Sequence, residues 1–156
     1  METRQTIREK FKTPEEELDF LRGEVERRER ELKENNVESS REHVAQEEVR
    51  RYRETPAEAV LHEEHRLPEE QAESLALGLA PETHDNQMME LIQIIRAKGI
   101  KNAMAVVARL RNPHLDDDFE KFLVQLVKSG FDLGLGKKNP LFRALQMTLY
   151  EVALPE

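Results

Sequence analysis

The segment His62-Glu63-Glu64-His65 carries the residue types of a catalytic metal site. A zinc protease needs two histidines four residues apart on one helix face, with a glutamate between them as the general base. Here Arg66 stands four residues after His62. The Glu-x-x-His pair of carboxylate-bridged iron sites is absent too, because His62 takes the glutamate's place. We therefore interpret the segment as structural or surface chain.

A second segment with chemical potential is the glycine-rich stretch from Gly130 to Lys138. A phosphate-binding loop needs a glycine five residues before its Gly-Lys pair, and then a serine or threonine that binds magnesium. Phe131 occupies the first of these positions and Lys138 the last. The spacing therefore excludes this type of nucleotide site, and we interpret residues 130–140 as a glycine-rich linker.

Three consecutive aspartates, Asp116 to Asp118, could be considered a metal cluster. Neighbouring residues on a helix point in different directions, however, and a calcium loop would need alternating ligands around a glycine. Acidic residues in a first helical turn are a simpler explanation. Because the chain also has no cysteine, we expect no catalytic residue, no cofactor-binding residue and no metal ligand. The sequence predicts a protein that is not an enzyme.

One basic segment stands out from a chain of net charge −8. Residues 91–115 contain five basic side chains and no acidic one, and Gly99 separates two predicted helices. This is the outline of a helix-turn-helix, in which basic flanks hold phosphates. The second helix offers few side chains able to contact base edges, so a helical hairpin with basic ends is the preferred interpretation. The residues that would contact nucleic acid are Arg96, Lys98, Lys101, Arg109 and Arg111.

The elements that carry these residues divide by composition near residue 55. In residues 1–66, 33 side chains are charged and 17 are hydrophobic, whereas residues 67–156 have 23 charged and 42 hydrophobic side chains. A segment as charged as the first cannot bury enough apolar area to fold by itself. We expect a charged helical arm over 1–54, partly disordered or coiled-coil-like, and a compact helical domain over 55–156.

The arm contains one convincing helix, which begins at Thr13-Pro14 with a capping-box glutamate at Glu16 and ends at Asn35-Asn36. Its apolar residues follow a two-in-seven spacing that is typical of a helix with a partner helix. A solvated charged helix with i,i+4 ion pairs is an equally good interpretation. We refer to these apolar residues as the seam, and they are Leu18, Leu21, Val25 and Leu32.

Helical spacing continues through the second part of the chain, and no convincing strand pattern precedes Thr148. Asp85 is expected to cap the helix that follows His84. The longest uninterrupted apolar run, residues 103–108, is far too short to cross a bilayer. The predicted fold class is therefore all-α, a short coiled-coil-like arm followed by a small bundle of helices near 68–80, 85–98, 101–111, 114–129 and 140–150.

The Asn112-Pro113-His114-Leu115 block resembles part of a known protein family, as do the stretches 99–103, 116–119, 122–125 and 147–152. Over about residues 55–156, the chain resembles the helical region that precedes the ATPase module in type IV secretion or conjugation-like proteins of candidate-phylum bacteria. The resemblance implies no nucleotide-binding residue here, because the family's ATPase lies downstream. It also implies a downstream ATPase as a partner, and a chain that is a truncated or split product.

Together these observations predict a non-enzymatic helical adaptor. The arm would bind a protein partner or a second copy, and the resemblance implies the accessory N-terminal part of a secretion or conjugation ATPase system. We expect a cytoplasmic protein without a transmembrane segment, held at the inner face of the membrane by its partners. The alternative is a nucleic-acid-binding module that uses the basic segment 91–115.

Overall fold

The structure, a computed structural model, describes residues 10–129. Over these residues the chain forms helices and no β-strand, apart from one isolated bridge between Phe11 and Leu61, which confirms the all-α prediction. The expected helix at 140–150 and the linker at 130–140 lie outside the described residues. The helices are α2 (Pro14–Glu34), α3 (Arg41–Glu54), α4 (Ala57–Val60), α5 (Glu69–Leu79), α6 (His84–Lys98), α7 (Ile100–Leu110) and α8 (Pro113–Lys128).

Local capping chemistry sets where several of these helices begin. The side chain of Thr13 accepts a hydrogen bond from the Glu16 N–H (3.1 Å), and that of Ser40 does the same at the start of α3. Before α6, the capping residue is Thr83, and Asp85 lies inside the first turn. The prediction of Asp85 as the cap was wrong because Thr83 offers its side-chain oxygen two residues earlier, before the first helical residue.

The end of α2 is a Schellman turn. Asn36 adopts a left-handed conformation (φ 58°), its N–H bonds to the Lys33 carbonyl (3.0 Å), and the Val37 N–H bonds to the Leu32 carbonyl (2.8 Å). Such a turn normally brings the side chains of Val37 and Leu32 into contact. The turn therefore closes α2 at the asparagine pair, as the sequence predicts.

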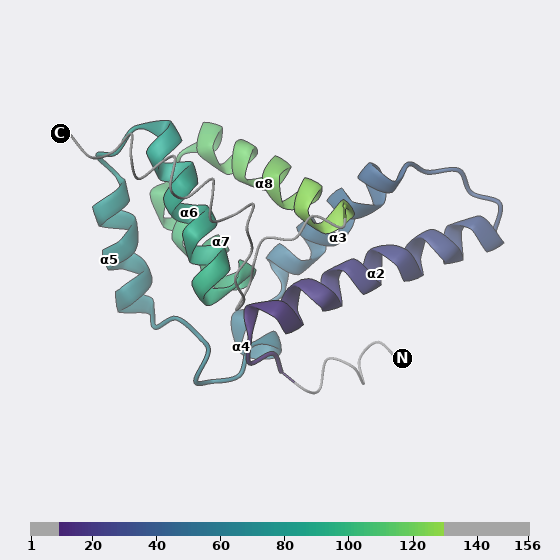
Figure 1. Cartoon of the computed structure of the whole chain (residues 1–156), viewed down its shortest axis with the longest axis horizontal. Coiled ribbons are helices and arrows are strands. Elements are labelled where there is room, and N and C mark those ends of the chain that lie inside the picture. Colours follow the sequence, from purple (N-terminus) through teal and green to yellow (C-terminus); the bar gives the residue numbers. More distant parts are fainter. Residues whose placement is uncertain (1–9, 130–156) are drawn as a thin grey trace, which may run out of the picture.

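Helix α7 lies at the centre of the bundle, where it contacts α2, α3, α5, α6 and α8 (Figure 1). Seven of its eleven residues are buried. Helices α2 and α3 form a hairpin that extends to one side, and α5 lies at the opposite edge, packed mainly against α7. The chain before α2 is tied down as well, because Phe11 exchanges backbone hydrogen bonds with Val60 and His62 (2.7 and 2.8 Å).

One hydrophobic core includes residues from both sides of the expected domain boundary. Leu18, Leu21 and Val25 are 4%, 2% and 0% exposed and belong to the same cluster as Phe119 and Val127 of α8. The structure thus differs from the expected division at residue 54. The composition of residues 1–66 concealed this, because a helix needs only a narrow apolar stripe to pack on its neighbours.

The seam of α2 obtains its partner helices from its own chain. Helix α2 packs against α3 and α8, and the first three seam residues fill that contact. Leu32, the fourth, lies near the far end of the hairpin and is only partly buried. The seam therefore does not supply a free surface for self-association, except at Leu32.

Two alanine substitutions distinguish a seam residue in the shared core from the partly buried Leu32. Leu21→Ala should lower the free energy of unfolding by about 2–5 kcal/mol, because it leaves a cavity in a shared core. Leu32→Ala should cost clearly less, because its side chain is partly solvated already. Urea denaturation followed by circular dichroism measures both. A separate transition of the remaining helices in Leu21→Ala, at the wild-type midpoint, would contradict a single core.

Candidate functional site

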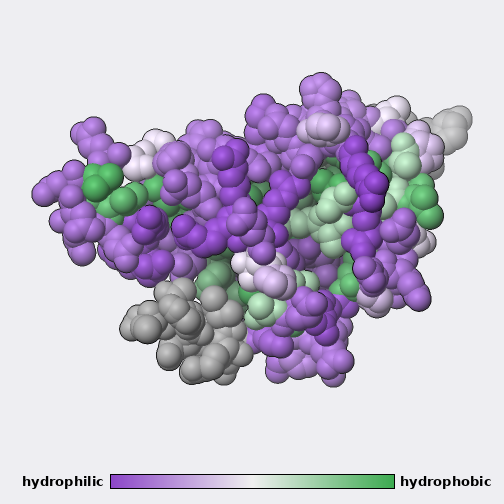
Figure 2. Space-filling view, turned by 180° about the vertical axis from the view of Figure 1, so that it is seen from behind, coloured by the Kyte–Doolittle hydropathy of each residue, from purple (hydrophilic) through white to green (hydrophobic). Residues whose placement is uncertain are grey.

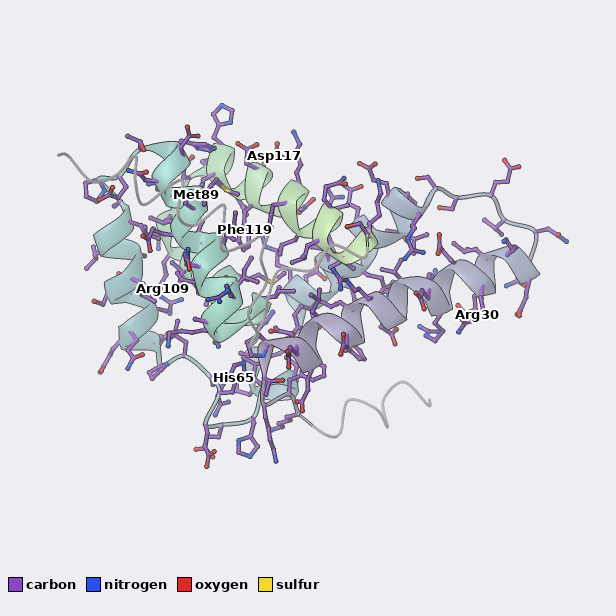
Figure 3. All side chains as sticks on the ribbon, viewed as in Figure 1. Arg30, His65, Met89, Arg109, Asp117 and Phe119 are labelled. Atoms are coloured by element: carbon purple, nitrogen blue, oxygen red, sulfur yellow. The ribbon has the colours of Figure 1, made fainter. Side chains whose placement is uncertain are left out.

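The five basic residues that the sequence singled out are not gathered on one face. The Lys101 side chain is 8% exposed, and its Nζ donates to the backbone carbonyls of Tyr52 (2.8 Å) and Arg53 (2.9 Å). Arg109 lies between α5 and α7, within ion-pair distance of Glu69 (3.4 Å) and Glu73 (3.2 Å) (Figure 3). These two side chains are therefore used inside the fold.

The other members lie apart from one another. Lys98 and Arg111 are exposed at opposite ends of α7, and Arg96 is half-buried on α6. An eleven-residue helix spans about 16 Å, so the two exposed charges do not form a compact phosphate site. Because α7 is the central helix, it cannot enter a nucleic-acid groove as a recognition helix. The helix-turn-helix outline is present, but its second helix belongs to the core.

A buried polar cluster joins α2, α3 and α7. The carboxylate of Glu17, fully buried, accepts hydrogen bonds from the N–H groups of Ile100 (2.7 Å) and Lys101 (2.6 Å), the first two residues of α7. The Tyr52 hydroxyl donates to the same carboxylate (2.5 Å). A carboxylate at a helix N-terminus is stabilised by the unpaired N–H groups and the helix dipole. Glu17 thus caps α7 from another helix.

Gly99 allows this approach. It is the single residue between α6 and α7, with φ 98°, and a Cβ atom added to it would overlap the Glu17 carboxylate. A side chain here would be strained by its backbone conformation and would displace the cap. The glycine that sequence analysis interpreted as a helix stop therefore also makes room for a distant residue.

Burial dominates the ionisation of this cluster. Desolvation raises the pKa of Glu17, although the bonds from Tyr52 and the two backbone N–H groups oppose the shift. Burial likewise raises the pKa of Tyr52 and lowers that of Lys101. The oxygens of the carboxylate are hydrogen-bonded within the fold, so the cluster serves to hold three helices together.

Sequence reasoning missed Glu17 and Tyr52. A signal was present, because α7 begins without a serine, threonine, asparagine or aspartate before its first residue. Glu17 also lies on the seam face, four residues before Leu21 and eight before Val25. A charged residue on a buried stripe, together with an uncapped helix elsewhere, indicates a cap from another segment.

The three aspartates considered as metal ligands have other partners. Asp116 pairs with Arg53, Asp117 with Lys121 (3.2 Å) and Asp118 with His84 (2.7 Å), so the three aspartates diverge as expected. Within residues 10–129, no group of three or more metal-binding side chains comes together.

Within the zinc-like segment, His65 packs over the start of α7. A Cβ atom at Gly99 would lie 3.3 Å from its Nε2, and burial lowers the pKa of the imidazole. His62 accepts a hydrogen bond from the Glu64 N–H (3.3 Å). The two histidines of this segment therefore have local roles in the fold.

A groove of about 460 Å³ lies at the tip of the α2–α3 hairpin. We call it the tip groove. Figure 2 shows a small hydrophobic patch near this tip, surrounded by hydrophilic residues. Val37, 49% exposed, is one of two large hydrophobic residues that are exposed within residues 10–129; the other, Leu77 (67%), is on α5. The residues that line the groove include the apolar Leu32 and Val37 and the charged Glu26, Arg30, Lys33 and Glu38.

The ionisation of Glu17 gives a pH-dependent prediction. Burial raises the folded-state pKa of Glu17 above the ordinary 4.5. Between these two pKa values, the folded chain therefore binds more protons than the unfolded chain. The stability contribution of Glu17 is therefore greatest below about pH 4.5 and falls as the pH rises through the folded pKa. Glu17→Gln should remove this decline and cost about 1–3 kcal/mol at neutral pH, because one backbone N–H loses its acceptor.

Urea denaturation of both proteins at several pH values measures the effect. The wild-type free energy of unfolding minus that of Glu17→Gln should fall with rising pH and then become constant. Tyr52→Phe, which removes a bond that favours the charged carboxylate, should extend the decline to higher pH. A difference that is flat or rises with pH would disprove the assignment.

Comparisons of the chain with protein-family models, curated proteins and solved structures gave no match. Among residues 10–129, no helix is both long enough and apolar enough to span a bilayer. The surfaces must therefore be judged by their own chemistry. By that measure, the tip groove is the site on which a functional proposal can be based.

Proposed function

We propose that this chain is a non-enzymatic helical adaptor that binds a protein partner through the tip groove. The observation that carries the proposal is the exposed Val37 side chain, set in a groove with half-buried Leu32 and a rim of charged residues. Protein interfaces commonly combine an apolar anchor with a polar rim in this way. The rest of α2 is anchored in the core, so the groove is presented on a rigid support.

The setting that we propose is a secretion or conjugation apparatus, on its cytoplasmic side and with an ATPase as a partner. This part of the proposal is supported by the resemblance of residues 55–156 and by the Asn112-Pro113-His114-Leu115 block. An ATPase reading frame directly after this gene would strengthen it, and unrelated neighbouring genes would weaken it.

The alternative of nucleic-acid binding has less support. Lys101 is buried and Arg109 is paired with α5, which leaves Lys98 and Arg111 as the exposed members of the five-residue set. Two separated charges neutralise few phosphates, so any binding would be weak and salt-sensitive. We therefore favour the protein adaptor.

A pair of matched substitutions tests the adaptor proposal. Val37→Asp places a charge in the tip groove, whereas Leu77→Asp places one on the similarly exposed hydrophobic residue of α5. Both variants should fold with the wild-type helix content, because both side chains are solvated. Affinity capture from a lysate, quantified for each captured protein, should show a partner that Val37→Asp loses and Leu77→Asp retains.

Loss of the same partner in both variants, or retention in both, would contradict the tip groove as the binding site. A photo-crosslinking residue at position 37 provides a second measurement. It should attach to the captured partner in the wild-type background, whereas the same residue at position 77 should not.

A further inference from the structure

The outward side of α2 carries six exposed residues in a regular 3-4-3-4-3 spacing. No described helix covers this side, and α3 and α8 lie on the other (Figure 1). Figure 3 shows Arg30 directed away from α3 on this surface. We call this set the outer stripe, and it consists of Glu16, Asp19, Gly23, Glu26, Arg30 and Lys33.

Four charges of the outer stripe have no ionic partner among the described residues, whereas its Glu16 accepts a hydrogen bond from the Lys12 N–H (2.8 Å). Elsewhere on the helix Arg27 pairs with Glu24 and Glu31 (2.9 and 3.0 Å), and Glu29 pairs with Arg41. Within the described part of the chain, Asp19, Glu26, Arg30 and Lys33 form no salt bridge. Glu15 and Glu34 form none either, so the stripe is one of the places on α2, and the one with both signs of charge, where no described residue neutralises the charges by a salt bridge.

Their order along the helix is self-complementary. Acidic residues occupy positions 16 and 19, and basic residues occupy positions 30 and 33. The helix dipole explains such a preference in the first and last turns only, and Asp19 and Arg30 lie outside those turns. When two copies of α2 are placed antiparallel about an axis between positions 23 and 26, residue 19 faces 30 and residue 16 faces 33.

Gly23 lies beside this axis. A glycine inside a helix costs about 1 kcal/mol relative to alanine, and nothing within the chain lies within 4 Å of a Cβ atom placed there. The fold of one copy therefore does not require glycine at this position. A close approach of a second helix would explain it, since glycine lets two backbones come near each other.

We propose that a second copy of this chain docks on the outer stripe in an antiparallel, twofold-symmetric pair. Asp19 of each copy faces Arg30 of the other, and Glu16 faces Lys33. The inference rests on the proposed adaptor function and specifies a partner for the same end of the molecule, because Glu26, Arg30 and Lys33 also line the tip groove. A twofold contact of this kind uses the same patch on both copies.

The residues beyond the helix ends extend the pattern. Exposed Lys12 precedes α2, and exposed Glu38 follows it in the turn that lines the tip groove. In the antiparallel arrangement these two positions come to the same end of the pair, again with opposite charges. Because exposed ion pairs are individually weak and screened by salt, the result is a weak dimer that is favoured at low ionic strength.

Reciprocal charge reversal tests the proposal on the full chain. Sedimentation velocity over a range of protein concentrations at low ionic strength should show a reversible dimer. Asp19→Arg alone and Arg30→Asp alone should each weaken it by roughly ten- to a hundredfold, because symmetry places two repulsive pairs in every dimer. The double variant with both changes should restore association, since the pairs are then reversed. Glu90→Arg, on an exposed residue of α6, is the control and should leave the dimer intact.

Gly23→Ala should have opposite effects on the stability of one copy and on the contact between two copies. It should raise the urea midpoint of unfolding, because alanine favours the helix and meets nothing within the chain, and it should weaken the dimer. A strict monomer at every concentration, or a dimer that the double variant fails to restore, would overturn the proposal. If the chain is monomeric while a captured partner still depends on Val37, the second copy is excluded and the adaptor function stands.

Discussion

The structure depends on one buried carboxylate. Glu17 lies in the first turn of α2, yet its oxygens bind the first two N–H groups of α7, 83 and 84 residues later in the chain, and the hydroxyl of Tyr52 on α3. Removing a carboxylate from water is costly. Here that cost is partly offset by bonds that point at the charge, and by the positive end of the α7 dipole, although burial still raises the pKa of Glu17. Because few other positions of α2 relative to α7 would satisfy all three donors, the cap also fixes the direction in which the α2–α3 hairpin leaves the bundle.

Lys101, a positively charged residue of the same cluster, binds the end of one helix, whereas Glu17 binds the start of another. Lys101 directs its ammonium to the carbonyls of Tyr52 and Arg53, where α3 ends and a helix dipole is negative. One residue thus has its N–H bound to the carboxylate and its side chain bound to the end of another helix. Ammonium and carboxylate both bind backbone groups in addition to attracting each other. This use of Lys101 removes it from the surface, so a charge that could have contacted a phosphate instead connects α7 to α3.

The sequence predicted what local chemistry decides and missed what distant contacts decide. The helix start at Thr13 could be predicted because the capping side chain and the N–H group that it binds are three residues apart. The burial of Val25 could not, because its partners on α3 and α8 follow in the chain and the surrounding residues are strongly charged. Composition averages over a whole helix, whereas packing depends on one face of it. Glu17, a charged residue on the apolar stripe of α2, was the sign in the sequence that this helix packs against a distant segment.

The net charge of the chain bears on how it can meet other molecules. Residues 54–95 contain ten acidic side chains and one basic one, a difference of −9 that accounts for the whole excess of acid in the −8 chain. These residues form α4, α5 and most of α6, and α5 lies at the edge opposite the α2–α3 tip (Figure 1). Two copies approaching at random would repel each other through such a surface. Antiparallel contact along α2, with the axis near Gly23, instead keeps the two α5 edges on opposite ends of the pair. Although α2 has nine acidic and five basic residues, its outer stripe has three acidic and two basic ones, so contact along this stripe is opposed less by charge than contact through the α5 edge.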